Sequence, residues 1–231
     1  MRIALLEDEP AQAELLRSWL TEAGYHCYVF TTGEAMLRAL GSDSFDLMIF
    51  DWELPGMNGI EVTHRVRERC GRNPPILFVT SRHQEKDVVE GLAAGADDYM
   101  TKPARRLELF ARLQALTRRT AQVNDDALEF PPYRFLSDQH AVKIGGETVQ
   151  LTTKEYQLAE FLFRNAGRLL SRGHILESVW GLRHDLNTRT VDTHVSLVRH
   201  KLAIDPARGW RLATIYRHGY RLERFDATEQ T

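Results

Sequence analysis

Residues 45–59 read FDLMIFDWELPGMNG: a run that is apolar except for Asp46, then a second aspartate, then a turn rich in proline and glycine. The apolar run over 45–50 is typical of a strand buried on both faces, as in a parallel sheet. Asp51 follows this strand directly, and the turn at 55–59 leads into a helix expected over 60–69. This order of strand, turn and helix predicts one unit of an α/β fold.

Similar units flank this stretch on both sides. Short apolar runs predict further strands at 2–6, 26–30, 75–79 and 98–100. Amphipathic segments predict helices between and after them, at 10–23, 34–40, 85–94 and 105–119. Five strand–helix units within about 119 residues indicate a parallel sheet with helices on both faces.

Polar side chains stand where four of these strands end. Glu7 and Asp8 follow the first strand, Asp51 the third, Thr80 the fourth and Lys102 the fifth. Open α/β sheets build their sites at the carboxyl ends of strands. Clustered carboxylates suit Mg²⁺, and one carboxylate can attack phosphorus and become an acyl phosphate. A lysine and a hydroxyl can hold the oxygens of the transferred group, so the pattern indicates phosphoryl transfer.

Residues 1–119 resemble the receiver domain of bacterial two-component response regulators. The segments that carry the resemblance are Glu7-Asp8, 51–59, Thr80-Ser81-Arg82 and 95–103. It implies a flavodoxin-like (βα)5 fold in which Asp51 accepts a phosphoryl group from a sensor histidine kinase.

The same resemblance assigns the other roles at this site. It implies that Mg²⁺ is held by Asp8, Asp51 and the backbone carbonyl of Glu53, with Glu7 acting mainly through water. Thr80 and Lys102 would bind the phosphoryl group. Tyr99 would be an aromatic switch that turns inward when Thr80 moves.

Several positions depart from the family pattern. Trp52 and Glu53 replace the common aliphatic pair, and Ala104 stands where phenylalanine usually follows Lys-Pro. In such receivers the second residue after the aspartate and the second after the threonine tune the phosphoryl lifetime. Here these residues are Glu53 and Arg82, and we hypothesise that they pair across the mouth of the site.

The resemblance also implies a surface for symmetric pairing of two receivers, formed by the fourth helix, the fifth strand and the fifth helix. Its expected ion-pair set comprises Asp98 with Arg112, Asp97 with Arg119, and Glu108. Val88 stands where a basic partner for Glu108 is usual, so we expect that pair to be absent and dimerisation to be weaker or differently arranged.

The second half predicts a smaller α+β domain over 127–226, after a polar linker at 120–126 and before a tail at 227–231. Short strands are expected at 133–136, 141–144 and 148–151, with Gly145-Gly146 as a hairpin turn. Helices are expected at 154–165, 172–180 and 188–203, with caps at Thr152 or Thr153, at Ser171, and at Asn187 or Thr188. A final hairpin would join 213–216 to 220–224.

This half resembles the winged helix-turn-helix effector domain of the OmpR/PhoB type. The segments that carry the likeness are 151–155, 170–172, 189–195, Lys201-Leu202 and 218–221. The helix at 188–203 turns an apolar side to the core and a short polar and basic side outward, which suits a major groove. Between residues 164 and 224, twelve basic side chains stand against five acidic ones, although the whole chain has a net charge of −2.

The likeness gives a set of DNA-binding candidates: Arg189, Thr193, Ser196, Leu197, Arg199, His200, Tyr216 and Arg217. Thr193, Ser196 and Leu197 would face bases, and Arg189 and Arg199 would contact phosphates. Leu197 stands where arginine is common, and Tyr216-Arg217 replace the usual Arg-Gly. Thymine-methyl contact and entry of Arg217 into the minor groove are therefore expected. The loop at 181–187 matches the surface that this family uses on RNA polymerase.

Composition narrows the function classes. The chain has 231 residues, 43% of them apolar, and only two cysteines, which excludes a disulfide scaffold and favours a reducing compartment. No signal peptide or membrane span is expected, so we predict a soluble, cytoplasmic, non-enzymatic regulator with DNA, a kinase and a second copy of itself as partners.

Two alternatives remain open from the residues. One is a DNA-binding regulator that works without phosphorylation, against which the complete set of Asp8, Asp51, Thr80 and Lys102 argues. The other is a Mg²⁺-dependent phosphohydrolase, which would need a second aspartate where Glu53 stands.

Overall fold

The chain forms two compact units, Met1–Ala121 and Gln122–Thr231, in a computed structural model that describes residues 1–71, 73–120, 128–181 and 188–225. The predicted linker beyond Thr120 and the predicted tail at 227–231 lie outside the described residues. Each unit is described by itself.

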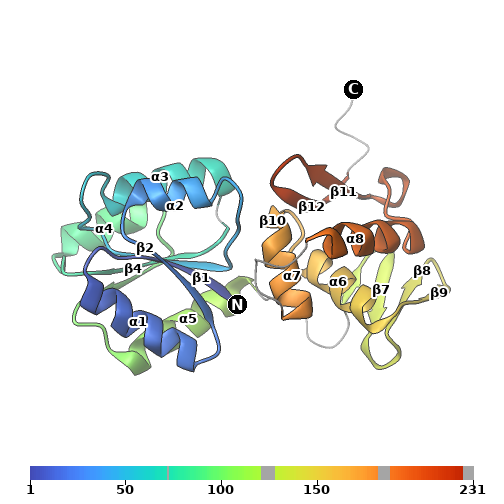
Figure 1. The fold of residues 1–231 in the computed structure, drawn as a ribbon, viewed down its shortest axis with the longest axis horizontal. Helices are drawn as coiled ribbons and strands as arrows, with labels where there is room; N and C mark the ends of the chain where they lie inside the picture. Colours follow the sequence, from blue (N-terminus) through green and yellow to red (C-terminus); the bar gives the residue numbers. More distant parts are fainter. Residues whose placement is uncertain (72, 121–127, 182–187, 226–231) are drawn as a thin grey trace. The chain divides into compact units, whose positions relative to one another are not determined.

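The first unit is a five-stranded parallel sheet in the order β2-β1-β3-β4-β5 (Figure 1). Its strands are β1 (Arg2–Leu6), β2 (His26–Phe30), β3 (Leu47–Phe50), β4 (Ile76–Thr80) and β5 (Asp98–Thr101). The alternating helices are α1 (Pro10–Glu22), α2 (Gly33–Ala39), α3 (Gly59–Cys70), α4 (Glu85–Ala93) and α5 (Arg106–Thr120). The predicted parallel sheet with helices on both faces is confirmed.

Two separate apolar clusters cover the two faces of this sheet. On one face, Leu16 and Leu20 of α1 and Leu109 and Leu113 of α5 are buried against the sheet. On the other face, α2 and α3 contribute core residues and α4 adds the partly buried Val88. Residues 47–50 are buried throughout, because the central strand β3 is covered on both sides.

The loop after β3 is fixed by local sequence. Asn58 caps α3 in a capping box: its side chain accepts from the Glu61 N–H, and the Glu61 side chain accepts from the Asn58 N–H. Gly59 packs directly against the backbone of Asp51. Only glycine fits at this position, because a Cβ would lie 2.3 Å from the Asp51 carbonyl oxygen. The loop is therefore held close to Asp51.

The described residues of the second unit form two small antiparallel sheets around three helices. One sheet has the order β6-β7-β8-β9 and the other β10-β12-β11. Its strands are β6 (Glu129–Phe130), β7 (Tyr133–Leu136), β8 (Ala141–Ile144), β9 (Glu147–Gln150), β10 (Leu170–Ser171), β11 (Trp210–Ile215) and β12 (Gly219–Arg224). The helices are α6 (Thr153–Arg164), α7 (Arg172–Trp180) and α8 (Arg189–Lys201), and short 3₁₀ turns lie at Ser137–Gln139 and Pro206–Arg208.

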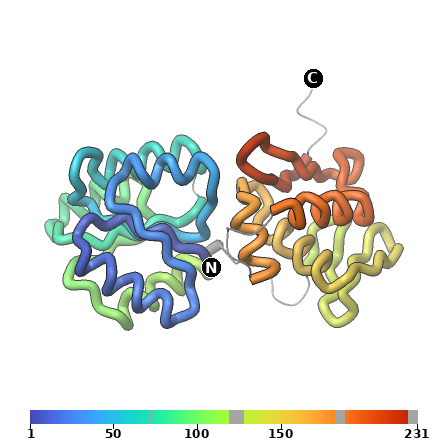
Figure 2. Tube along the Cα trace, in the orientation of Figure 1, coloured from blue at the N-terminus to red at the C-terminus, as the bar shows by residue number. Residues whose placement is uncertain are grey.

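A single core joins these elements. The apolar side of α8 is buried in this core, as the helical spacing predicts. Its buried residues are Val191, Val195 and Val198, and Leu202, directly after the helix, is buried with them. The hairpin β11–β12 follows α8 in the chain and forms the red end of the trace (Figure 2). The winged-helix arrangement predicted for this half is confirmed.

The observed elements differ from the predicted ones at a few points. The two-residue strands β6 and β10 were not expected, and β11 begins at Trp210 rather than at 213. Thr152 and Ser171 cap α6 and α7 through their side chains, whereas Thr188 makes no such bond and Asn187 lies outside the described residues. Across the described ranges, no helix has the length and apolar character required to cross a membrane.

Candidate functional site

Three carboxylates meet at the carboxyl edge of the first unit's sheet. Glu7 and Asp8 follow β1, and Asp51 follows the neighbouring strand β3. Glu7 and Asp51 are buried and Asp8 is exposed, and one oxygen from each lies within 4.8 Å of the others. The structure thus brings together the acidic residues that the strand ends predicted.

Asp51 is held by contacts to both of its oxygens. Its Oδ1 accepts from the backbone N–H groups of Trp52 at 2.6 Å and Glu53 at 3.2 Å, and its Oδ2 accepts from Lys102 Nζ at 2.7 Å. The side chain is 6% exposed. The carboxylate is therefore oriented, ionically paired and buried, while the neighbouring Asp8 is exposed.

Lys102 connects two acids. Its Nζ also lies 2.8 Å from Glu7 Oε2. Burial would lower the Lys102 pKa, but the bonds to Asp51 and Glu7 outweigh it and raise that pKa. Burial raises the pKa of Glu7, which Lys102 only partly offsets. Lys102 is thus a fixed positive charge directly beside Asp51.

Thr80 joins this group from β4, the strand between β3 and β5. Its side chain is fully buried, and its Oγ1 accepts from the Arg82 N–H at 3.5 Å. The Thr80 carbonyl accepts from the Lys102 N–H at 2.8 Å, so the two predicted phosphoryl-binding residues are linked through the backbone.

Tyr99 lies inward in this structure. Its ring is 7% exposed and lies 6.0 Å from the Phe78 ring, centroid to centroid. Its hydroxyl donates to the Arg82 carbonyl oxygen at 2.9 Å. Burial raises the Tyr99 pKa to about 12, so the hydroxyl remains a proton donor at neutral pH.

The Arg82 side chain lies over the mouth of the site. Its guanidinium stands 5.0 Å from the Trp52 ring, and its nitrogens lie 3.5 Å from carboxylate oxygens of both Glu53 and Asp87. The hypothesised pair of Glu53 with Arg82 is present in the geometry. The contacts to Trp52 and Asp87 were not predicted, since nothing in the local pattern links these positions.

The donor set fits a magnesium ion. All three groups offer hard carboxylate oxygens, which Mg²⁺ prefers over nitrogen or sulfur ligands. The exposed Asp8 leaves the cluster open to water, which this ion normally retains. The Lys102 ammonium group lies 2.7 Å from Asp51 Oδ2, so the negative charge of this cluster already stabilises one cation.

The acids and arginines of the predicted pairing surface make contacts within the chain. Arg112 Nη1 lies 2.9 Å from Asp98, and Arg112 Nη2 lies 2.7 Å from Glu108, so these three residues do form one cluster. Within the chain, the Asp97 carboxylate binds Arg67 at 2.6 Å and the Ile76 N–H at 2.8 Å, and its pairing with Arg119 stays a prediction. The side chain of Arg119 lies outside the described part of the chain.

The second unit exposes the polar side of α8. Arg189, Thr193, Ser196 and His200 are exposed, and Leu197 is 42% exposed. Arg199 is half-buried, and its guanidinium donates to the Leu212 carbonyl oxygen on β11 at 2.8 Å.

The tip of the β11–β12 hairpin carries an aromatic and a cation. Tyr216 is 80% exposed, and the Arg217 guanidinium lies 5.3 Å from its ring centroid. Arg217 has a φ of 62°, in the left-handed region that favours glycine. Tyr216 and Arg217 thus form one projecting pair on a strained turn.

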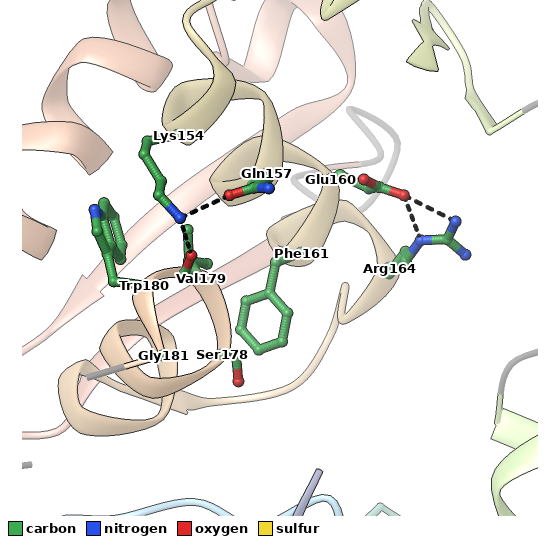
Figure 3. Close-up of a pocket in the computed structure, with 9 residues that line it drawn as sticks. All are labelled: Lys154, Gln157, Glu160, Phe161, Arg164, Ser178, Val179, Trp180 and Gly181. Carbon is green, nitrogen blue, oxygen red and sulfur yellow. Dashed lines mark hydrogen bonds and ion pairs between the residues drawn. The ribbon is translucent and has the colours of Figure 1, made fainter. Parts of the chain in front are cut away.

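A hollow between α6 and α7 is lined by Lys154, Gln157, Glu160, Phe161, Arg164 and residues 178–181 (Figure 3). Lys154 Nζ donates to Gln157 Oε1 at 3.0 Å and to the Val179 carbonyl oxygen at 2.7 Å. Arg164 pairs with Glu160. Because these cations are already paired, the hollow gives no sign of a small-molecule ligand. It borders Gly181, where the loop predicted to contact RNA polymerase begins; residues 182–187 of that loop lie outside the described residues.

Comparison with known proteins covers both units. The family model of the response regulator receiver domain matches residues 3–114, and that of the C-terminal domain of transcriptional regulatory proteins matches residues 146–222. The sensory transduction protein RegX3 of Mycobacterium tuberculosis is 39% identical over 225 residues, which cover 96% of this chain and 98% of that protein.

Two further similarities extend over nearly the whole chain. The DNA-binding response regulator MtrA of Mycolicibacterium smegmatis is 36% identical over 220 residues, covering 95% of this chain and 96% of that one. The crystal structure of the response regulator DrrB, an OmpR/PhoB homologue from Thermotoga maritima, is 27% identical over 96% of this chain and 98% of that one, with a TM-score of 0.47.

Proposed function

The chain belongs to the OmpR/PhoB family of two-component response regulators, which join a receiver to a DNA-binding domain and regulate transcription, and on this premise we propose that Asp51 is its phosphoacceptor. The observation that carries the proposal is the Asp51 carboxylate, bound on one oxygen by Lys102 and flanked by Glu7 and Asp8. A cognate sensor histidine kinase would supply the phosphoryl group, and the site lies in a cytoplasmic regulator rather than an enzyme.

The residues around Asp51 have distinct tasks in this reaction. One Asp51 oxygen attacks phosphorus, and the bond from phosphorus to the donor atom breaks. Lys102, already 2.7 Å from Asp51 Oδ2, then holds an oxygen of the acyl phosphate, and the Thr80 hydroxyl holds another. Asp8, Asp51 and the Glu53 carbonyl would hold Mg²⁺, with Glu7 acting through water. When bound, this ion supplies positive charge to the transferring oxygens.

The phosphoacceptor is tested by the intact mass of the full chain after incubation with a small phosphodonor and Mg²⁺. We expect one added phosphoryl group in the wild type and in Asp138→Ala, which removes an exposed carboxylate elsewhere. Asp51→Ala should gain none. Phosphoryl addition that persists in Asp51→Ala would contradict the assignment, and no addition to the wild type would favour a phosphorylation-independent regulator.

In the second unit, we propose that α8 enters the major groove of duplex DNA. Thr193, Ser196, Leu197 and His200 would face the base edges, and Arg189 would contact a phosphate. The exposed Leu197 supplies an apolar group that can contact a thymine methyl. Tyr216 and Arg217 would enter the adjacent minor groove. Phosphorylation would favour a homodimer on DNA, and residues 181–187 would contact RNA polymerase.

The proposed contacts to bases and phosphates are tested by selecting the duplexes that the wild-type chain binds from a random library and then comparing variants with it. Leu197→Ala should relax the preference at a T·A position while leaving the salt dependence of binding unchanged. Arg189→Ala should weaken all duplexes alike and lower the slope of log K against log salt by about one. An unchanged base preference in Leu197→Ala would remove that residue from the base-reading set.

A further inference from the structure

The β11–β12 hairpin has limited support from its own sheet. Among the residues that the structure describes, β11 is the outer strand and pairs only with β12, and the third strand, β10, pairs with just Gly219 and Tyr220. The backbones of β10 and β12 approach each other closely at this pairing, because a Cβ on Gly219 would lie 2.0 Å from the Leu170 carbonyl oxygen. An isolated two-stranded hairpin is marginally stable, so contacts from outside the sheet decide how firmly it is held.

Asp192 of α8 provides one such contact. Its Oδ1 accepts from the Tyr220 hydroxyl on β12 at 2.5 Å and from Arg172 Nε at 2.8 Å. The Arg172 guanidinium also lies 5.0 Å from the Tyr220 ring centroid. Tyr220 is 5% exposed, and burial together with the nearby Asp192 raises its pKa, which keeps the hydroxyl a donor. A single carboxylate thus ties α8 to β12.

Arg199 provides a second contact, to the other strand. Its Nη2 donates to the Leu212 carbonyl oxygen at 2.8 Å and lies 3.4 Å from Thr214 Oγ1, both on β11. Arg199 follows Asp192 by seven residues, nearly two helical turns, so both side chains leave α8 on similar sides. The helix therefore holds both strands of the hairpin from two points along its length.

We infer that Asp192 and Arg199 are positioning residues that lock α8 and the β11–β12 hairpin into one rigid reading unit. This inference rests on the proposal that both elements contact DNA. Arg199 acts through the hairpin rather than on a phosphate. Binding then requires little ordering of the hairpin, because the spacing between α8 and the Tyr216–Arg217 tip is already set in the free protein.

The test uses three variants in the full chain: Arg199→Lys, Arg199→Ala and Tyr220→Phe. Lysine keeps the charge but loses the planar guanidinium that reaches β11, and phenylalanine keeps the ring but loses the hydroxyl. Arg211→Ala is the matched control, since it removes a cation from β11 that pairs with Glu223 and not with α8.

The first measurement is amide hydrogen exchange of β11 and β12 without DNA. Each of the three variants should exchange roughly three- to tenfold faster in the hairpin, as expected for one lost hydrogen bond, with little change in α6. Arg211→Ala should match the wild type. Unchanged hairpin exchange in Arg199→Ala and Tyr220→Phe would overturn the inference, whether or not any duplex is bound.

The second measurement is affinity for a short fluorescent duplex selected by the wild type, at several salt concentrations. All three variants should bind roughly three- to tenfold more weakly with an unchanged salt slope. A phosphate-contacting Arg199 would behave differently: alanine would lower the slope by about one, and lysine would restore binding. That result would overturn the positioning role, whereas failure of the wild type to bind any duplex would overturn the DNA-binding proposal instead.

Discussion

Arg82 is held by more groups than its position in a surface loop suggests. Its backbone oxygen accepts from Tyr99, and its guanidinium contacts Trp52, Glu53 and Asp87. The contact to Glu53, at 3.5 Å, is solvated and contributes little to folding, whereas the contact to Asp87, also at 3.5 Å, reaches a buried carboxylate. Their effect is expected on the access of water to the phosphoryl group, because Arg82 and Glu53 flank Asp51.

This geometry predicts that Glu53 and Arg82 act together on phosphoryl lifetime. We expect Glu53→Ala and Arg82→Ala each to change the dephosphorylation rate, and the double variant to change it by clearly less than the product of the two single effects. The rate is followed by the loss of the phosphorylated mass after the phosphodonor is removed. Strictly multiplicative effects would show that the two charges act independently.

Gly91 makes room for the aromatic residues behind this loop. A Cβ there would lie 3.1 Å from Tyr99 Cε2 and 3.3 Å from Trp52 Cζ3. Both rings are buried and also contact Phe78, so neither can easily move away.

We therefore expect Gly91→Ala to lower the free energy of unfolding by about 1 kcal/mol, although alanine is the better helix former. Urea denaturation measures the change. In a Trp52→Leu background the contact at 3.3 Å is removed but the Tyr99 contact at 3.1 Å remains, so the penalty should shrink rather than vanish. A stabilised Gly91→Ala single variant would mean that the rings yield more easily than their packing indicates.

The sequence predicted correctly which strand-end residues of the site lie close together. Strand ends in a parallel sheet converge, so Glu7, Asp8, Asp51 and Lys102 could be placed together without a structure. Side-chain partners from other elements could not. Asp97 pairs with Arg67, 30 residues away on α3, and only the folded chain brings these two together.

Among the elements, α6 shows how one side chain can serve two purposes. Glu155 completes the capping box with Thr152 and also accepts from Lys201 Nζ, at the end of α8, at 2.8 Å. Burial would raise the Glu155 pKa, but Lys201 and Thr152 outweigh it and hold that pKa below its ordinary value of 4.5. A depressed carboxyl pKa contributes stability above the unfolded value, and this stability is lost as pH falls through the folded value.

Glu155→Gln should accordingly destabilise the second unit by about 1 kcal/mol at neutral pH. The amide oxygen can still accept from the Thr152 N–H, but the charge opposite Lys201 is gone. Urea unfolding followed by fluorescence, to which the buried Trp210 of this unit contributes, should show the difference from wild type shrinking below pH 4.5. A difference that is constant from neutral to acid pH would assign the effect to packing rather than to charge.

Helices and strands were predictable where they are long enough to show a periodic pattern of apolar residues. Helices α6, α7 and α8 lie within a few residues of their expected bounds, because their apolar stripes and most of their caps are encoded locally. The strands β6 and β10 have two residues each, too few to show an alternation. β10 forms because a strand distant in sequence pairs with it, as Tyr220 does with Leu170, whereas β6 pairs with β7, which follows it directly.

Two of the acids expected to take part in a phosphorylation-dependent dimer, Asp97 and Asp98, already have partners within the chain. Asp97 is bound by Arg67, and Arg112 is shared between Asp98 and Glu108 of the same chain. The exposed part of α4 carries two large apolar residues beside the charged Lys86 and Glu90: Val89 is 61% exposed and Leu92 is 44% exposed. These two residues are three apart, so they lie on the same side of the helix.

We therefore predict that dimerisation of the phosphorylated chain depends more on Leu92 than on charge pairing. Leu92→Asp would place an unpaired carboxylate in the contact and should weaken the dimer at least tenfold, while Asp51 still accepts the phosphoryl group. Light scattering over a range of concentrations, with phosphodonor and Mg²⁺ present, measures the association. Leu15→Asp is the matched control, because Leu15 is 41% exposed on α1, across the sheet from α4. An equal loss in both variants would point to a general effect of the added charge, and an unchanged dimer in Leu92→Asp would move the contact away from α4.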